Sequence, residues 1–457
     1  MRHCAHIPAL AGIWRLARCP QTPYTENLMD ARTGPSRSLA LLLLALLAML
    51  AYAPSLTIPL LEDDYPNLWQ SLNYGSPAGL SALFHDPIFR LRATSYWVMF
   101  LLWHVSKVAP YAYHAVSLAL HIVNTWLLYW ICAAWPRMRA VAFWAAAFFA
   151  VQEGHQEAVM WFSAINELFL FLFGMAALLC WMKQEERDRG WGLQVAGVLL
   201  FVLALLSKES AVVFLPLFLL AIPAANWRRS AVRLLPYPLL AGLAVASITS
   251  TRSYSFRFSD GSFSLHAPFW ITWPHSYFRL LWVWGLLAGV AILLAKDRAL
   301  RRAALVALAW IGLALAPYSF LTYSTQIPSR QTYLASAGLA LLVGIALAHW
   351  SAKWPARRRI LAAVLVLVMA QNIAYLWTRK RAQFMERAAP TDQLIALARR
   401  TPGPIWVRCF PRTEYIATEA VRLAAGYAPS DLIWSEPEAT RRHPAAVFCF
   451  GDAPPKR

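Results

Sequence analysis

The sequence predicts an all-α polytopic membrane protein with a small α/β domain at its C-terminal end. Two features of its composition indicate this class: of 457 residues, 59% are hydrophobic and only 14% are charged. Soluble chains carry about 25% charged residues, so this chain has too few charges to cover a surface in water. The composition therefore excludes a soluble enzyme, a disordered chain and a disulfide scaffold.

The third observation is a series of apolar runs, because a helix needs roughly 20 apolar residues to cross a bilayer. We expect about 11 transmembrane helices, of which the third is short. The first run begins too far along the chain for an ordinary signal peptide, and we expect it to be a retained membrane helix. The predicted spans are 39–60, 112–134, 139–152, 162–182, 191–207, 210–226, 233–250, 278–295, 303–321, 332–350 and 359–377.

The basic residues predict the orientation. Lys and Arg exceed Asp and Glu by 42 to 23, and in membrane proteins such an excess lies at cytoplasmic helix ends. A cytoplasmic arm (1–38) then places five later basic connections on the same side, provided that 93–108 lies on the outer leaflet as an interfacial helix. If 93–108 crossed instead, every later loop would change side. We expect a multi-pass protein of the inner (plasma) membrane, in contact with the lipid bilayer, and no nucleic-acid partner.

This orientation divides the chain into three parts. The arm is followed by a transmembrane domain (39–377), whose long first outer loop is 61–111, and by a small extracytoplasmic domain (378–457). In that last part PIWVRCFP and AAVFCF are typical of strands, with a helical pattern between them. Cys409 and Cys449 could form a disulfide if this part is exported.

Three carboxylates follow the first predicted span, in Leu61-Glu62-Asp63-Asp64. Burial against the bilayer surface and mutual repulsion would raise the pKa of at least one of them, which suits a general base near neutral pH. The alternative is a solvated helix end. Asp63 and Asp64 are the candidate catalytic residues.

A second polar group follows the third span and contains His155 and Glu157, with Glu167 ten residues beyond. No spacing here matches a known set of metal ligands, so a hydrogen-bonded pocket wall is the better interpretation. A divalent metal is possible but not indicated.

The candidate cations lie on the same predicted face. Lys208 and Glu209 form a charged pair between two apolar runs, where the lysine either extends to the membrane surface or meets an anion there. Arg330 faces outward against the positive-inside rule, and a phosphate would be a natural partner. Arg92 is similar, and Tyr333 stands close after Arg330.

Six stretches in this order resemble the polyprenyl-phosphate-sugar-dependent glycosyltransferases of the GT-C fold. The resemblance covers about residues 40–350 and is greatest to protein O-mannosyltransferase-like proteins, which often carry tetratricopeptide repeats. The stretches are LEDDYPN, FRLRATSYW, YHAVSLALHIVNTWLLY, GHQEAVMWFSAINELFLFLFG, LALLSKESAVVFLPL and SRQTYLASAGLALL.

This resemblance implies an active site open to the outer leaflet, with an acidic pair at Asp63 and Asp64. It also implies that Lys208 and Arg330, with Arg92 a further candidate, contact the lipid phosphate, and that His155, Glu157, Glu167, Glu209 and Tyr333 line the pocket. The chain departs from the family at Gln152 and Glu153, where histidine-proline is usual, and at Ile165, where arginine is usual. No tetratricopeptide array follows.

The expected reaction is the transfer of a sugar, a hexose with mannose as the first candidate, from a polyprenyl-phosphate donor to a hydroxyl of an extracytoplasmic protein or glycan. One displacement would invert the anomeric centre. Fixed cations could stabilise the departing monophosphate, so no cofactor is required. The alternatives are a lipid-linked polysaccharide transporter or flippase, a polymerase, and a catalytically degenerate scaffold.

Overall fold

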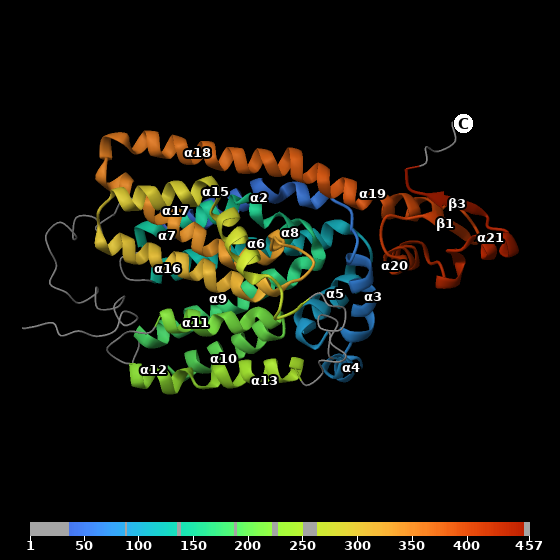
Figure 1. Cartoon of the computed structure of the whole chain (residues 1–457), viewed down its shortest axis with the longest axis horizontal. Helices are drawn as coiled ribbons and strands as arrows, with labels where there is room; N and C mark the ends of the chain where they lie inside the picture. The colour runs from blue at the N-terminus through green and yellow to red at the C-terminus, as the bar shows by residue number, and fades with distance from the viewer. Residues whose placement is uncertain are drawn as a thin grey trace, which may run out of the picture.

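The computed structural model describes residues 36–86, 89–134, 139–186, 190–221, 227–249 and 263–451. Within these ranges the chain forms a bundle of long helices with a small domain at one end (Figure 1). Nearly all of the predicted cytoplasmic arm lies outside the described residues, as does the first part of the connection between the predicted spans 233–250 and 278–295.

Helices account for the whole bundle. Their bounds are α2 Arg37–Tyr52, α3 Asp64–Tyr74, α4 Leu80–His85, α5 Ala93–Ser106, α6 Pro110–Ala134, α7 Arg139–Val151, α8 Gln156–Met160, α9 Ile165–Glu186, α10 Trp191–Leu205, α11 Phe214–Leu220, α12 Trp227–Leu234, α13 Pro236–Thr249, α15 Phe269–Leu294, α16 Arg298–Leu315, α17 Tyr333–Lys353, α18 Arg358–Tyr375 and α19 Arg381–Ala398. Short 3₁₀ turns join several of them.

Every predicted span corresponds to a helix, but the helices differ in length. In the described part of the chain, eight are long and apolar enough to cross a membrane. The segments Val141–Val151, Trp191–Leu205 and Glu209–Leu220 are apolar but shorter than 18 residues. The chain is thus a multi-pass membrane protein, and the predicted count of about 11 spans is not confirmed.

The segment 93–108 forms helix α5, which is not among those eight spans or the three shorter apolar helices of the described chain. It packs against α3 at the end of the bundle where α3 and α4 also lie (Figure 1). This position agrees with the expectation that α5 does not cross the membrane. That it rests on the outer leaflet stays a prediction.

Helix α17 forms the centre of the bundle and contacts α7, α15 and α16. Small residues allow the close approach that membrane helices use for packing. A Cβ atom on Gly338 would lie 2.6 Å from the carbonyl oxygen of Ala307 in α16, and one on Gly344 would lie 2.9 Å from the backbone nitrogen of Ala145 in α7. Any side chain at these two glycines would therefore force the helices apart.

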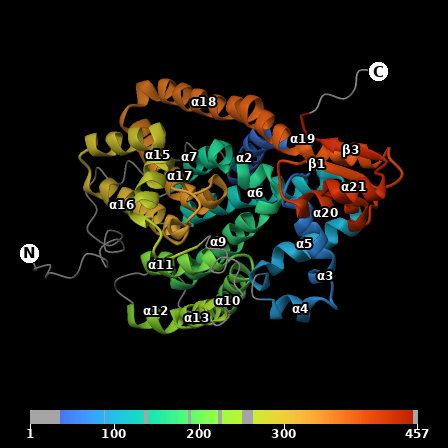
Figure 2. The same ribbon diagram turned by 45° about the vertical axis from the view of Figure 1, so that its right-hand side comes forward.

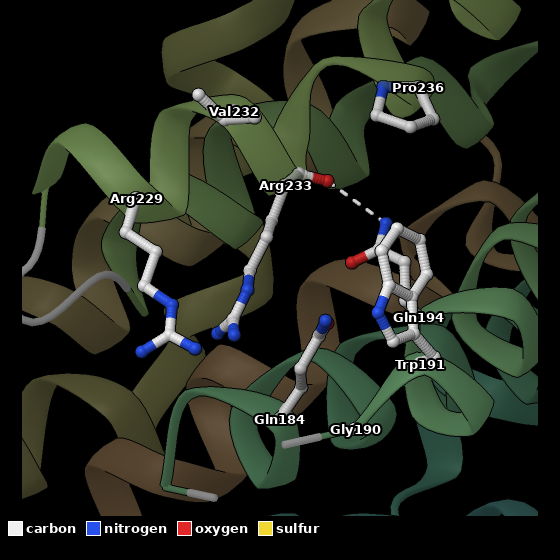
Figure 3. A pocket seen from close by; sticks show the side chains of 8 residues that line it. All are labelled: Gln184, Gly190, Trp191, Gln194, Arg229, Val232, Arg233 and Pro236. Atoms are coloured by element: carbon white, nitrogen blue, oxygen red, sulfur yellow. Dashed lines mark hydrogen bonds between the residues drawn. The ribbon is translucent and has the colours of Figure 1, made fainter. Parts of the chain in front are cut away.

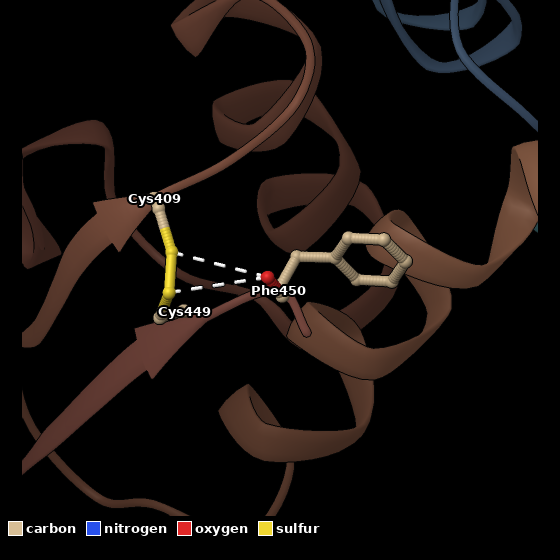
Figure 4. Close-up of a disulfide and its surroundings, with 3 residues drawn as sticks. All are labelled: Cys409, Cys449 and Phe450. Atoms are coloured by element: carbon tan, nitrogen blue, oxygen red, sulfur yellow. Dashed lines mark hydrogen bonds between the residues drawn. A yellow bond between two sulfur atoms is a disulfide. The ribbon is translucent and has the colours of Figure 1, made fainter. Parts of the chain in front are cut away.

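The C-terminal domain is built on a parallel sheet of three strands in the order β2-β1-β3. The strands are β1 Ile405–Cys409, β2 Leu432–Ile433 and β3 Ala446–Cys449, and they confirm the two predicted strands. Parallel neighbours need crossover connections, which α20 (Glu414–Ala425) and α21 (Glu436–Arg442) help to provide. A disulfide joins Cys409 to Cys449, the pairing that the sequence left open (Figure 4).

A continuous helical segment, Pro355–Ala398, connects the bundle to this domain; we call it the stem. It contains α18, a π-helical turn at Leu376–Lys380, and α19. The domain lies against the end of the bundle formed by α3 and α5, in both views (Figures 1 and 2). Helix α20 packs on α3, where the guanidinium of Arg422 stacks on the ring of Trp69 at 3.3 Å.

Candidate active site

Asp64 begins helix α3 and is fully buried. One carboxylate oxygen accepts a hydrogen bond from the backbone nitrogen of Leu61 at 2.9 Å. The other accepts two from Ser163, from its backbone nitrogen at 2.7 Å and its hydroxyl at 2.6 Å. Burial raises the pKa of Asp64 to about 7, although these three donors act in the opposite direction. Asp64 therefore fixes the start of α3 to the segment before α9.

Asp63, one residue earlier, is exposed. Partial burial and the neighbouring Glu62 raise the pKa of Asp63, while the positive charges of Arg330, Arg387 and Arg412 oppose this rise. A carboxylate that is exposed and has a raised pKa can both reach a substrate and accept a proton from it. Of the two predicted catalytic residues, Asp63 is accessible to a substrate, whereas Asp64 is buried and hydrogen-bonded to the protein.

Glu62 holds two arginines beside Asp63. Arg387 of α19 donates to its two carboxylate oxygens at 3.1 and 2.5 Å, and Arg412 of the C-terminal domain donates at 2.7 Å. The side chain of Glu62 is only 12% exposed. A partly desolvated carboxylate with bidentate partners holds those partners firmly.

Arg330 is held less tightly. Its guanidinium lies 3.7 Å from Glu157, and its backbone nitrogen donates to the same carboxylate at 3.2 Å. Arg387 lies 4.0 Å from the other oxygen of Glu157. Both guanidinium groups lie over the ring of Trp161, at 4.9 Å for Arg330 and 4.6 Å for Arg387. We call Glu62, Asp63, Glu157, Arg330, Arg387 and Arg412 the open cluster.

A second charged group is almost closed to solvent. The ammonium of Lys208 contacts a carboxylate oxygen of Glu167, and the exposed fractions of the two side chains are 4% and 2%. Tyr318 donates to the other Glu167 oxygen at 3.2 Å, and its ring lies 4.8 Å from the lysine nitrogen. We call Glu167, Lys208 and Tyr318 the closed cluster.

Arg92 lies beside the closed cluster and forms an ion pair with Glu209 at 2.6 Å. Burial lowers the pKa of Arg92, and the nearby Glu167 opposes this effect. One residue after Glu209, the hydroxyl of Ser210 lies 2.7 Å from that of Tyr318. The predicted phosphate-binding residues Lys208 and Arg92 therefore belong to one neighbourhood, in which each already has a carboxylate partner.

The start of helix α9 joins this neighbourhood to the acidic pair. Ser163, in the turn before α9, binds Asp64, and Glu167, in the first turn, binds Lys208. Four helical residues span only about 6 Å along the axis. The structure thus brings the start of the 61–111 loop and the Lys208 segment to the same end of the bundle.

His155 and Tyr333 are fully buried. The ring of His155 lies 2.6 Å from the hydroxyl of Ser336, and the hydroxyl of Tyr333 lies 2.8 Å from a ring nitrogen of His121. Burial and the neighbouring His121 lower the pKa of His155, so the ring is neutral. These two residues form buried, hydrogen-bonded packing, and in the chain they stand two residues before Glu157 and three residues after Arg330.

Three residues of this region were not predicted as site residues. Arg387 and Arg412 belong to the stem and the C-terminal domain, where no motif distinguishes them from many other arginines. Tyr318 was hidden in an apolar run. In the described part of the chain, no group of three His, Cys, Asp or Glu side chains is arranged to hold a metal ion.

Comparisons with known proteins extend this picture. No family model matches the sequence. Protein O-mannosyl-transferase Tmtc1 of Drosophila melanogaster is 31% identical over 105 residues, which are 23% of this chain and only 12% of that protein. This match agrees with the family resemblance but covers too little of either protein to define the whole chain.

Two solved structures share the architecture. ArnT from Cupriavidus metallidurans in the apo state superposes with a TM-score of 0.52 at 13% identity, covering 91% of this chain and 90% of ArnT. The apo oligosaccharyltransferase of Archaeoglobus fulgidus gives 0.52 at 12% identity, covering 87% of this chain and 64% of that one. Such low identities establish the fold and not the activity.

The fold is therefore that of the GT-C membrane transferases, as the resemblance of the six sequence stretches implies. The particular sequence likeness is to the protein O-mannosyl-transferase, over the short region given above.

Proposed function

We propose that this protein is a membrane glycosyltransferase that uses a polyprenyl-phosphate sugar as donor. It transfers a hexose, mannose being the first candidate, to a hydroxyl of an extracytoplasmic protein or glycan. The observation that carries the proposal is that the accessible Asp63 lies within the electrostatic influence of three arginines, Arg330, Arg387 and Arg412. The next residue, Asp64, binds Ser163 in the turn before α9. The fold supports it, and so does a second structure of the same ArnT, which is bound to undecaprenyl phosphate.

In the proposed reaction Asp63 takes the proton of the acceptor hydroxyl. The acceptor oxygen attacks the anomeric carbon, the bond from that carbon to the phosphate oxygen breaks, and the lipid phosphate leaves with the bonding electrons. A single displacement inverts the anomeric centre. Asp63 then releases its proton to water. Asp64 holds Asp63 in place through the start of α3.

The cations stabilise the charge that develops on the leaving phosphate. Arg330 is the best placed for first contact, because its distance of 3.7 Å to Glu157 leaves its guanidinium donors able to turn toward an anion. Arg92 and the deeper Lys208 are paired with Glu209 and Glu167. In the proposal their charge reaches the phosphate only when it displaces these carboxylate partners. Fixed cations suffice for a monophosphate, so the proposal requires no metal ion.

In this proposal the site faces the outside of the inner (plasma) membrane, and the N-terminal arm is cytoplasmic. The disulfide in the C-terminal domain supports this orientation, because disulfides persist in oxidising compartments.

The test uses the purified full-length protein in proteoliposomes, with polyprenyl-phosphate sugars that carry a radiolabel on mannose, glucose or galactose. Hydroxyl acceptors are serine- and threonine-containing peptides and oligosaccharides. We expect labelled acceptor and an equal amount of released polyprenyl phosphate, with and without a chelator. Movement of labelled lipid across the bilayer without transfer would identify a flippase, and neither event would identify a scaffold; both results contradict the proposal.

A further inference from the structure

Arg279 is the one Lys, Arg, Asp or Glu among the 26 residues of helix α15. Charged side chains are rare in membrane helices because they are costly to bury, and those that occur usually have a partner or a function. The guanidinium of Arg279 donates to the side-chain oxygen of Gln326 at 2.8 Å and to the carbonyl oxygen of Ile327. Both acceptors belong to residues 325–327, which we call the anchored segment.

Two neighbours of Arg279 on α15 hold the same segment. Ser276 is fully buried and accepts a hydrogen bond from the backbone nitrogen of Ile327 at 3.0 Å. A ring nitrogen of His275 lies 3.2 Å from the carbonyl oxygen of Thr325. Residues three and four positions apart lie on one face of a helix, so these three side chains form one hydrogen-bonding face. The backbone of Ile327 is therefore held at both its nitrogen and its carbonyl oxygen.

The anchored segment leads directly into Arg330. Pro328 follows it, and the 3₁₀ turn Ser329–Thr332 carries Arg330. The backbone nitrogen of Gln331 donates to the carbonyl oxygen of Pro328 at 3.0 Å, which closes the turn. Because the ring of a proline fixes its φ angle, Pro328 is a stiff link between the anchored segment and the turn. A shift of Ile327 would therefore move Arg330.

The opposite side of this part of α15 is fixed to α16. The indole nitrogen of Trp273 donates to the carbonyl oxygen of Gly312 at 3.0 Å, and the hydroxyl of Tyr277 donates to that of Leu308 at 2.9 Å. The start of α15 is thus hydrogen-bonded to α16 on one side and to the anchored segment on the other.

Helix α15 is broken at Trp282, whose φ of 43° and ψ of −155° are not helical. A bulky residue at positive φ strains the backbone, and such strain persists only where the surrounding structure holds it. The break separates residues 269–281, which carry all the side chains described above, from residues 283–294. The first part can therefore take the orientation that its contacts require without following the rest of the helix.

Arg279 also lies within the electrostatic influence of Glu157, the partner of Arg330. Two nitrogens of its guanidinium, Nη1 and Nη2, donate to the anchored segment. This arrangement suits a side chain that holds the Arg330 turn in place beside Glu157, rather than one that binds a substrate itself.

We propose that residues 269–281 of α15 position Arg330 for the phosphate of the lipid donor, with Arg279 as the principal positioning residue. Arg279 and Ser276 fix Ile327, and Ile327 fixes the turn that carries Arg330. This proposal rests on the proposed function, because there Arg330 meets the phosphate. A binding group that is misplaced by about 1 Å can cost a large factor in rate, so the loss of Arg279 should reduce transfer although Arg330 is still present.

The first experiment is a double-mutant cycle on sugar transfer by the full-length protein in proteoliposomes. The variants are Arg279→Gln, Arg330→Gln and the two combined, and kcat/KM is measured for whichever of the three labelled polyprenyl-phosphate sugars the wild type uses. Ser276→Ala loosens the same segment without removing a charge, and it serves in place of Arg279→Gln if that variant does not fold.

A matched control lies toward the other end of α9, in a recess of about 990 Å³ that Gln184 and Gln194 help to line (Figure 3). The side-chain nitrogen of Gln194 donates to the carbonyl oxygen of Arg233 at 2.9 Å. Gln194→Leu therefore removes a hydrogen bond from a side chain to a backbone carbonyl between two helices, as Arg279→Gln does. No residue of the open or closed cluster is among the described residues that line this recess.

We expect Arg279→Gln to lower kcat/KM about tenfold, the factor that corresponds to one hydrogen bond from a charged group. Ser276→Ala should lower it by a smaller factor, and Gln194→Leu should leave it unchanged. Adding Arg279→Gln to Arg330→Gln should cause no further loss, because residues that act through one another are not additive. A normal kcat/KM in Arg279→Gln would overturn the proposal. So would a further loss in the double variant, which would mean that Arg279 acts independently of Arg330.

The second experiment does not need a donor. Hydrogen–deuterium exchange of the backbone amides of residues 325–331, followed by mass spectrometry, should be faster in Arg279→Gln and in Ser276→Ala than in the wild type, and unchanged in Gln194→Leu. Equal exchange in all four proteins would overturn the proposal. If the wild type transferred no sugar, the proposed function would fail, and the exchange rates would still decide whether α15 holds the segment before Arg330.

Discussion

The open and closed clusters contain similar groups but expose them differently. In the closed cluster Lys208 and Glu167 are almost inaccessible, and each holds the other. In the open cluster the side chains of Arg330, Glu157 and Arg412 are 28%, 23% and 40% exposed, and the Arg330–Glu157 pair is loose. The difference indicates that a substrate can replace one partner of an ion pair in the open cluster at little cost in free energy. The closed cluster would have to give up a buried ion pair to do the same.

The largest expected effect concerns Asp63, the proposed base in the open cluster. Asp63→Asn should lower sugar transfer by about 10²–10⁴-fold, the usual contribution of a general base, because the amide cannot accept the acceptor's proton. Membrane insertion and thermal stability should be unchanged. Transfer is measured as label moved to the acceptor in proteoliposomes.

Glu438→Gln is the matched control for Asp63→Asn, since it removes a carboxylate from an exposed ion pair with Arg442 in the C-terminal domain. It should transfer sugar as the wild type does. Normal transfer by Asp63→Asn would remove Asp63 from the mechanism and leave Asp64 as the base.

The second prediction concerns a variant in which the ion pair of the closed cluster is broken. Lys208→Met leaves Glu167 buried without its cation, and breaking a buried pair in this way costs about 3–5 kcal/mol of unfolding free energy. The double variant Lys208→Met/Glu167→Leu should recover most of that stability, because it removes both charges. Chemical or thermal unfolding in detergent measures both.

The double variant also separates the two roles of Lys208. If the lysine contacts the donor phosphate, the stable double variant should keep a donor KM at least about tenfold higher than that of the wild type. A wild-type KM together with recovered stability would mean that Lys208 acts only in folding.

The third prediction concerns pH and the support of the open cluster. The pKa of Asp64 is raised to about 7 in the folded protein, against about 4 in an unfolded chain. The folded state therefore holds this proton more tightly. The contribution of Asp64 to the free energy of unfolding is fully present below pH 4 and decreases by up to about 4 kcal/mol as the pH rises to 7.

Asp64→Asn removes this titration. We expect the midpoint temperature of thermal unfolding of the wild type to fall as the pH rises from 4 to 8. The midpoint of Asp64→Asn should not show this decrease. Parallel curves for the two proteins would mean that Asp64 does not titrate with a raised pKa.

The smallest expected effect tests the contribution of the C-terminal domain. Arg412→Gln should change stability by less than about 1 kcal/mol, because its pair with Glu62 is partly exposed and Arg387 still holds Glu62. The loss of one positive charge should raise the pKa of Asp63 further. The acid limb of the pH profile of kcat/KM should then move to higher pH, whereas Arg442→Gln should leave it in place. An unmoved limb would show that Arg412 does not act on Asp63.

The sequence predicted the helices well, because apolar runs and basic connections report directly on a membrane environment. The number of membrane-spanning helices was harder to predict, because α7, α10 and α11 are apolar but short. Length alone does not decide whether such helices cross the membrane. The two principal strands of the C-terminal domain followed from their alternation of apolar residues.

The site was predictable only where its residues belong to a motif. Asp63, Asp64, Lys208 and Arg330 stand out because charges are rare next to apolar runs. Arg387 and Arg412 do not, because the tail is rich in arginine and each contact with Glu62 joins residues more than 300 positions apart. The partners of the charged side chains could not be predicted either. The sequence shows that Lys208 and Glu167 are present, but not that the two form an ion pair.

The stem has a mechanical consequence. Its 44 residues extend about 66 Å, roughly twice the thickness of a bilayer's hydrocarbon core. One continuous helical segment therefore begins in the membrane and ends beyond it. Helices adjust to thicker or thinner bilayers by tilting. Because Arg387 lies in α19, toward the end of the stem that joins the C-terminal domain, we expect a change in the tilt of the stem to shift its contact with Glu62.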